Sequence, residues 1–180
     1  SSSTSRRQFL SRTAAIGVGF GVWSSRSPVV RANESVLQGL SAACIGVGGK
    51  GSSDTSHIAE QGVSIVGLCD VDGGTVDKKS REFPDAGKFD DFREMLEKLG
   101  DKIDIVTVST PDHTHAVAAL KAMQMKKHVY CQKPLTWSIH EARLMRETAE
   151  KMGVVTQMGN QGTSENGLRE AVEVLSLIHI

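Results

Sequence analysis

Short apolar runs alternate with longer amphipathic or polar stretches from about residue 40 to residue 157. The apolar runs are typical of strands that are buried on both faces of a sheet. The stretches between them place apolar side chains three or four positions apart, as on one side of a helix. We predict strands at 41–47, 63–69, 103–108, 128–131 and 154–157. We predict helices at 55–61, 75–83, 92–99, 116–125 and 139–152.

This alternation predicts the fold class. A chain of 180 residues is long enough for one domain with a core of its own. Strands that are separated by helices form parallel sheets whose two faces are both covered. We therefore predict an α/β fold, a Rossmann-type doubly wound parallel sheet, in residues 33–174.

A glycine-rich segment follows the first predicted strand and opens the next helix. At these places Gly46 makes a tight turn, Gly48 lets the backbone approach a pyrophosphate, and Gly51 lets helix and strand pack closely. The N–H groups at the start of the helix then face the phosphates. We predict that Gly46, Gly48, Gly49 and Gly51 bind the pyrophosphate of a nicotinamide dinucleotide. Lys50 is either a solvated side chain or a further phosphate contact.

An acidic residue, Asp70, ends the second predicted strand, 19 residues after Gly51. A carboxylate at this place accepts hydrogen bonds from ribose hydroxyls and repels a 2′-phosphate. We therefore expect NAD rather than NADP as the cofactor. Asp72 competes with Asp70 for the same role.

Composition and charge exclude several other classes of protein. The chain is 39% hydrophobic and 23% charged, as in ordinary globular proteins. Residues 1–32 contain five arginines and no acidic residue, so the rest is mildly acidic and nucleic acid is not an expected partner. Three cysteines without CxxC spacing argue against a disulfide framework or a zinc site. We expect Cys44, Cys69 and Cys131 to be buried thiols.

The N-terminal segment has the features of an export signal. The pair Arg6-Arg7 precedes a weakly apolar stretch at 14–23, which is too short to span a bilayer. Small or medium residues at 30–32 suit a signal peptidase. We predict that residues 1–32 are a twin-arginine signal, which makes the export machinery a partner and the mature protein periplasmic or exported, without a stable membrane span. The alternative is a basic tail without structure.

Two further motifs resemble one known family. Residues 109–115, Ser-Thr-Pro-Asp-His-Thr-His, are similar to the third-strand loop of the Gfo/Idh/MocA oxidoreductases. Residues 131–135, Cys-Gln-Lys-Pro-Leu, resemble the family's Glu-Lys-Pro motif. With the glycine segment and Asp70, the resemblance covers about residues 41–170. It implies hydride transfer between NAD(P) and a sugar, cyclitol or related polyol.

The resemblance also implies roles for individual residues. Thr110, Pro111 and His113 would line the nicotinamide-ribose side of the cofactor site, and His115 would start the following helix. Lys133 would lie beside the nicotinamide and the reacting carbon, where a cation stabilises the negative charge that develops on the substrate oxygen. A lysine there can also take part in a proton relay. Lys133 is therefore the catalytic candidate.

Gln132 departs from the family pattern, which has glutamate at this position. A glutamine still donates and accepts hydrogen bonds, and we expect Gln132 to contact the cofactor. It cannot change the proton affinity of a neighbour by charge, so Lys133 would be less strongly held in its charged form. Gln132 therefore keeps open a binding module that performs no chemistry.

Three functions stay open at this point. The first is an NAD-dependent dehydrogenase of a sugar or polyol. The second is an NAD-dependent, redox-neutral glycosidase, because some relatives oxidise a sugar transiently, eliminate the glycoside and then reduce the product. The third is a dinucleotide-binding module without chemistry. Gln157, Asn160 and Gln161 follow the last predicted strand and are placed to reach cofactor or substrate. We expect no metal site, because His113 and His115 lack a third ligand.

The C-terminal end suggests a truncated chain. The family's substrate-binding α/β domain, which would carry the acid and base residues, would follow residue 170 or so, and we expect it to be missing from this chain. Residues 175–180, Leu-Ser-Leu-Ile-His-Ile, match the translated end of a common sequencing adapter, and we expect them to be foreign. The alternative is an apolar helix that continues from 168–174. Whether the protein forms a homo-oligomer stays open.

Overall fold

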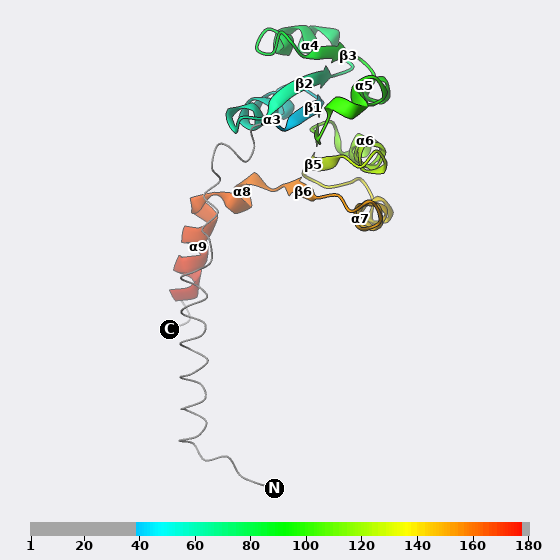
Figure 1. Ribbon diagram of the computed structural model, residues 1–180. Coiled ribbons are helices and arrows are strands. Elements are labelled where there is room, and N and C mark those ends of the chain that lie inside the picture. The colour runs from blue at the N-terminus through cyan, green and yellow to red at the C-terminus, as the bar shows by residue number, and fades with distance from the viewer. Residues whose placement is uncertain (1–38, 178–180) are drawn as a thin grey trace, which may run out of the picture. The chain divides into compact units, whose positions relative to one another are not determined.

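The computed structural model describes residues 39–177 (Figure 1). The predicted twin-arginine signal, residues 1–32, and the last three residues, 178–180, lie outside this described part. Within residues 39–177, no helix combines the length and the apolar character that a membrane crossing requires.

Six parallel strands form one sheet in the order β3-β2-β1-β4-β5-β6. The strands are β1 (Ser41–Ile45), β2 (Ser64–Cys69), β3 (Gly87–Phe89), β4 (Ile105–Val108), β5 (His128–Gln132) and β6 (Thr156–Gly159). The order reverses between β1 and β4, which opens a crevice at the carboxyl ends of these two strands. The sheet confirms the predicted doubly wound, Rossmann-type fold.

Helices cover the sheet on both faces, as Figure 1 shows. One face carries α3 (Gly49–Glu60) and α4 (Gly73–Ser80), and the other carries α5 (Phe92–Leu99), α6 (Asp112–Gln124) and α7 (Ile139–Met152). Strand β1 is buried on both sides: Ala42 and Cys44 pack toward α3 and α4, whereas Ala43 and Ile45 pack toward α5 and α6. Its continuous apolar sequence follows from this position.

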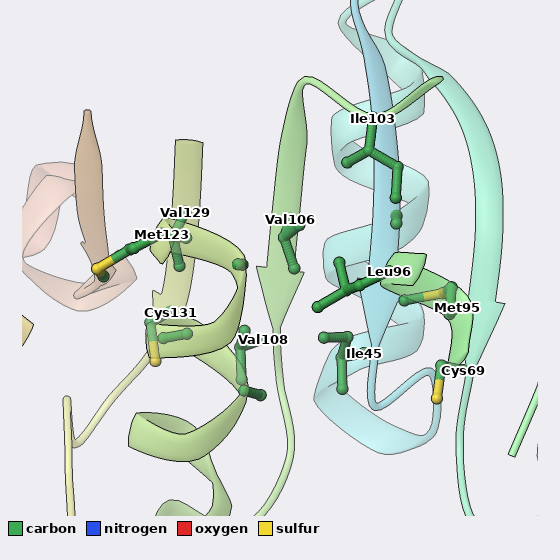
Figure 2. Close-up of a cluster of buried hydrophobic side chains, with 14 of the residues drawn as sticks. Ile45, Cys69, Met95, Leu96, Ile103, Val106, Val108, Met123, Val129 and Cys131 are labelled. Atoms are coloured by element: carbon green, nitrogen blue, oxygen red, sulfur yellow. The ribbon is translucent and has the colours of Figure 1, made fainter. Parts of the chain in front are cut away.

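The larger core cluster lies under α5, α6 and α7 (Figure 2). Val106 and Val108 of β4 and Val129 of β5 point into it, and Met123 of α6 covers them. Buried alanines on α6 let this helix approach the sheet closely: Ala116, Ala118, Ala119 and Ala122. The Ala-rich composition therefore serves packing as well as helix propensity.

The three cysteines are free and buried, as predicted. Burial raises the pKa of the Cys69 thiol to about 12. It raises the pKa of the Cys131 thiol to about 12 as well. The pKa of the Cys44 thiol is also raised by burial. These thiols are therefore held in the neutral form within the core.

Several element boundaries differ from those predicted. Helices α3 and α6 begin at Gly49 and Asp112, earlier than the predicted starts at 55 and 116, because their first turns are polar or glycine-rich and carry no apolar periodicity. Strand β3 was not predicted, since it has three residues and a lysine in the middle. Strand β6 begins at Thr156 and not at 154.

The chain continues after β6 into α8 (Gln161–Ser164) and α9 (Asn166–Leu177), and a short 3-10 turn, η1 (Gly100–Lys102), precedes β4. Helix α9 runs through residue 174, where the sequence suggested a boundary. The foreign origin of residues 175–180 stays a prediction.

Candidate functional site

The crevice between β1 and β4 contains a cavity of about 550 Å³ at the carboxyl ends of the strands. The loops after β1, β2, β3 and β4 form its walls. Six of the residues that were predicted to bind the cofactor line it: Gly46, Gly48, Asp70, Thr110, Pro111 and His113. Residues distant in the sequence therefore meet at one site.

Glycine is required at two positions of the loop between β1 and α3. Gly46 has a φ of +79°, and a Cβ there would lie 2.7 Å from the carbonyl oxygen of Ser109. A Cβ on Gly51 would lie 1.8 Å from the carbonyl oxygen of Gly46. The first glycine therefore permits the turn, and Gly51 permits the close packing of helix α3 against that turn.

The start of helix α3 is open to an anion. Gly48 occupies the N-cap position, where no side chain caps the helix, and the first turn contains no acidic residue. A Cβ on Gly49 would meet no atom within 4 Å. The first N–H groups of the helix therefore lack side-chain partners and fit a phosphate.

Asp70 faces the cavity, and the competing Asp72 does not line it. Each oxygen of the half-buried Asp70 carboxylate accepts one backbone hydrogen bond, from Val47 N at 2.9 Å and from Asp72 N at 3.1 Å. Asp72 caps helix α4, and its bonds from Thr75 Oγ1 and Gly74 N lower its pKa. Asp70 keeps lone pairs for ribose hydroxyls, whereas Asp72 is engaged in capping.

The loop after β4 contributes an unpaired hydroxyl. Thr110 Oγ1 is buried and has no hydrogen-bond partner among residues 39–177. A buried hydroxyl without a partner is costly, so a polar group of a ligand in the adjoining cavity would satisfy it. This orphan hydroxyl and the open start of α3 show that the residues present fit a dinucleotide. Pro111 occupies the N-cap position of α6, and the His113 side chain, 68% exposed, lies at the rim.

His115 joins the two motifs that carry the family resemblance. It lies inside the first turns of α6 and is 1% exposed, so it does not start the helix as predicted. Its Nε2 lies 2.7 Å from the carbonyl oxygen of Thr110, and its Nδ1 lies 2.8 Å from the carbonyl oxygen of Pro134. The buried ring thereby ties the loop after β4 to the loop after β5.

Gln132 and Lys133 lie at the end of β5 and do not line the cavity described above. Gln132 is 5% exposed, and its Oε1 accepts a hydrogen bond from Lys133 N at 3.1 Å. Lys133 is exposed, and its ammonium makes no hydrogen bond or ion pair with the described part of the chain. Its side chain is therefore free to meet a ligand at the strand ends.

Asp54, on helix α3, is a site residue that sequence reasoning missed. Its carboxylate is largely buried, and Oδ2 accepts hydrogen bonds from Ser109 Oγ and Gln132 Nε2, each at 2.8 Å. Its Oδ1 pairs with Lys50 Nζ at 2.6 Å. Lys50 is therefore an ion-pair partner, which neither alternative for it included. The spacing of Gly51, Asp54 and Ile58 on one helix side was the signal that could have found Asp54.

A second, polar cavity of about 590 Å³ lies at the end of β6. Gln157, Asn160 and Gln161 line it, and Gln161 Nε2 donates a hydrogen bond to Tyr130 Oη at 2.8 Å. None of its lining residues lines the cavity between β1 and β4. In residues 39–177, no three His, Cys, Asp or Glu side chains are grouped so that they could hold a metal ion.

Comparison with known proteins agrees with this geometry. The sequence profile of the GFO_IDH_MocA family, described as an oxidoreductase family with an NAD-binding Rossmann fold, matches residues 40–160. A curated relative from Saccharopolyspora erythraea, named "Glycosyl hydrolase family 109 protein", is 32% identical over 200 residues, which cover 97% of this chain and 42% of the relative. The chain thus spans less than half of that relative.

Solved structures give the same result for the fold. GenD2 from gentamicin A biosynthesis, in complex with NAD, is 26% identical with a TM-score of 0.63, over 68% of this chain and 34% of that protein. Myo-inositol 2-dehydrogenase from Lactobacillus plantarum is 24% identical with a TM-score of 0.69, over 76% of this chain and 41% of that one. The profile and the NAD complex confirm the predicted cofactor, NAD.

Proposed function

Because this chain belongs to the Gfo/Idh/MocA oxidoreductase family with its NAD-binding Rossmann fold, we propose that it transfers a hydride between NAD and a sugar, cyclitol or related polyol. The observation that carries the proposal is one crevice that combines the open start of α3, the Asp70 carboxylate and the orphan hydroxyl of Thr110. These groups match a pyrophosphate, a ribose diol and a further polar group of one dinucleotide.

Each part of the chain then has a binding task. The N–H groups of Gly48, Gly49 and Gly51 bind the pyrophosphate, and Asp70 accepts hydrogen bonds from the adenosine ribose. Thr110, Pro111 and His113 line the nicotinamide-ribose side. Bound NAD supplies the hydride acceptor that the side chains of a protein lack.

Lys133 is the proposed catalytic residue. Its ammonium has no partner in the described residues, and it follows directly on the buried Gln132 at the strand end. A cation at this place stabilises negative charge on a substrate oxygen that loses its proton. The ammonium also holds a proton that a relay can exchange with the substrate.

The charges around the cavity support NAD over NADP. Asp70, Asp90 and Asp91 all line it, and the one guanidinium there, that of Arg93, is paired with Asp91 at 2.7 Å. A 2′-phosphate would therefore meet carboxylates without a free cation. We expect Asp70→Ala to weaken NADH binding and to lower the ratio of the NADH affinity to the NADPH affinity. Isothermal titration with each cofactor measures both affinities. Equal affinity for NADH and NADPH in the unaltered protein would show that this role of Asp70 is wrong.

A redox-neutral glycosidase is the second candidate. It is favoured by the relative named as a family 109 glycosyl hydrolase, which is similar over 97% of this chain. It is also favoured by the predicted export signal, because free NAD is scarce outside the cytoplasm and such a reaction needs no supply of it. We propose that residues 1–32 direct export by the twin-arginine route to the periplasm or beyond.

One experiment separates the two candidates. The full-length protein is purified with its cofactor and given glycosides without added NAD. Multiple turnovers with release of the leaving group identify the glycosidase, whereas one stoichiometric reduction of the bound cofactor identifies the dehydrogenase. A protein that binds NADH tightly and performs neither reaction on any sugar or polyol would be a binding module, and the proposed activity would be wrong.

A further inference from the structure

The carboxylate of Asp54 lies buried between helix α3 and the ends of two strands. It accepts hydrogen bonds from Ser109, after β4, and from Gln132, at the end of β5. We infer that Asp54 supplies, from a different element, the negative charge that glutamine lacks at position 132, and that it is the positioning residue for the Gln132–Lys133 segment. This inference rests on the proposed function, which places the nicotinamide beside Lys133.

The hydrogen bonds of Asp54 fix the orientation of the Gln132 amide. An ionised carboxylate only accepts hydrogen bonds, so the NH₂ group of Gln132 must face Asp54. Its Oε1 is then directed to the backbone N–H of Lys133, at 3.1 Å. A Cβ on Gly159 would lie 2.9 Å from the Gln132 amide, so the neighbouring strand packs closely against it. The amide therefore has one arrangement, and it holds the backbone of Lys133.

The charge of Asp54 is only partly balanced inside the protein. Two of its three donors, Ser109 and Gln132, are neutral. The third is the ammonium of Lys50, whose side chain is 47% exposed, so water screens that charge more than it screens the buried carboxylate. The carboxylate therefore contributes negative potential at the ends of β4 and β5, beside the positive charge of Lys133.

That potential distinguishes the two redox states of the cofactor. The oxidised nicotinamide ring carries a positive charge and the reduced ring does not, so a nearby buried carboxylate favours NAD⁺ over NADH. Loss of the carboxylate must change the ratio of the two affinities. A residue that only held the fold together would weaken both affinities alike.

The test measures the dissociation constants of NAD⁺ and NADH by isothermal titration for the unaltered protein and its variants. For Asp54→Asn we expect the preference for NAD⁺ relative to NADH to fall about fivefold, because one partly screened negative charge is removed from the site of the ring. Lys50→Gln should change the ratio in the opposite direction, because it leaves the carboxylate without its cation. Asp101→Asn removes an exposed charge in η1, at the amino end of the central strand β4 and away from the carboxyl ends that form the site, and should leave the ratio unchanged.

The double variant Asp54→Asn/Gln132→Glu, which exchanges the carboxylate and the amide between the two positions, gives the most discriminating test. It returns one carboxylate to the site, with the new amide donating to the new glutamate, so the ratio should return to that of the unaltered protein. Gln132→Glu alone sets two carboxylates side by side and should lower the melting temperature. If the ratio of the NAD⁺ and NADH dissociation constants is the same in all variants, the role of Asp54 is wrong, although the protein still binds NAD. An unaltered protein that binds neither form would overturn the proposed function itself, and this inference with it.

Discussion

At Gly51, helix α3 meets the turn of the glycine loop with no space for a side chain. A Cβ there would lie 1.8 Å from the carbonyl oxygen of Gly46, so Gly51→Ala must displace either the turn or the helix. We expect it to cost about 3 kcal/mol of unfolding free energy, as overpacking does, and to abolish NADH binding. Urea unfolding and fluorescence titration measure the two effects.

The matched control for this substitution is Gly73→Ala, because a Cβ on Gly73 would meet no atom within 4 Å. It also begins a helix, α4, and should change stability by less than about 1 kcal/mol. If both variants bind NADH like the unaltered protein, the glycine loop does not hold the pyrophosphate.

The side chain of His115 holds two loops together. Its ring is buried between the carbonyl oxygens of Thr110 and Pro134. His115→Ala removes the N–H that the ring donates between these carbonyl oxygens and opens a cavity, so we expect a loss of about 3 kcal/mol in unfolding free energy. The exposed His140 on α7 gives the control, since His140→Ala removes the same side chain without a buried contact. Equal stability of the two variants would contradict the structural role of His115.

Single residues were predictable from the sequence where their role depends on the local backbone. Gly46 and Gly51 follow from the geometry of a turn between a strand and a helix, and Asp70 follows from its place at a strand end. Asp54 was not predictable in this way. The spacing from Gly51 places it on the packed side of α3, but its role arises from contacts with Ser109, 55 residues away, and with Gln132, 78 residues away, which local sequence does not specify.

At the level of elements, helix α7 is the helix within residues 39–177 that begins with a full capping box. Ser138 accepts a hydrogen bond from the N–H of Glu141, and the Glu141 side chain accepts one from the N–H of Ser138. We expect Ser138→Ala to lower the unfolding free energy by about 1 kcal/mol, because the N–H of Glu141 loses its side-chain acceptor at the start of the helix. Urea unfolding measures the change.

The control for the cap is Ser80→Ala, at the C-terminal end of α4. There the hydroxyl donates a hydrogen bond to the carbonyl oxygen of Asp77 and caps no N–H group. It should be nearly neutral, because alanine has the better helix propensity. A Ser138→Ala variant as stable as the Ser80→Ala variant would show that the cap of α7 contributes nothing.

Capping and apolar spacing also explain which elements were predicted well. Helix α7 has the predicted bounds, 139–152, because an amphipathic pattern lies between a capping box and Gly153, whose φ is +66°. The first turn of α3 was missed, since its polar and glycine residues are set by the ligand site and by packing against the turn. The short strand β3 forms only because β2 offers it a partner along one edge.

For the whole molecule, the decisive feature is that both faces of the sheet are covered. The two core clusters lie on opposite sides of β1 and β4, and this makes the crevice at the reversal of strand order a rigid site. The continuous apolar strands predicted this architecture. The substrate was not predictable, because this chain spans 42% of its curated relative and no described cavity contains a motif specific to one sugar.

Burial of the thiols makes the stability of the whole molecule sensitive to alkaline pH. The pKa values of Cys69 and Cys131 are raised to about 12 in the folded protein, whereas free thiols ionise at about 8.5. Their folded-state pKa values exceed the unfolded ones. The stability that the neutral, buried thiols contribute is therefore fully present below about pH 8.5 and is lost as the pH rises toward 12. We expect the unfolding free energy to fall by about 1 kcal/mol per pH unit for each thiol between pH 9 and 10.5.

The measurement is urea unfolding at a series of pH values for the unaltered protein and for Cys69→Ala/Cys131→Ala. The double variant starts from a lower stability because it leaves small cavities, and its stability should decline less steeply above pH 9. Native Cys69 and Cys131 should also resist iodoacetamide at pH 8.5 until urea unfolds the chain, since the neutral buried thiol is neither nucleophilic nor accessible. Parallel pH profiles for the two proteins would mean that other groups cause the alkaline loss of stability. Rapid alkylation of the folded protein would show that these side chains are not sealed in the core.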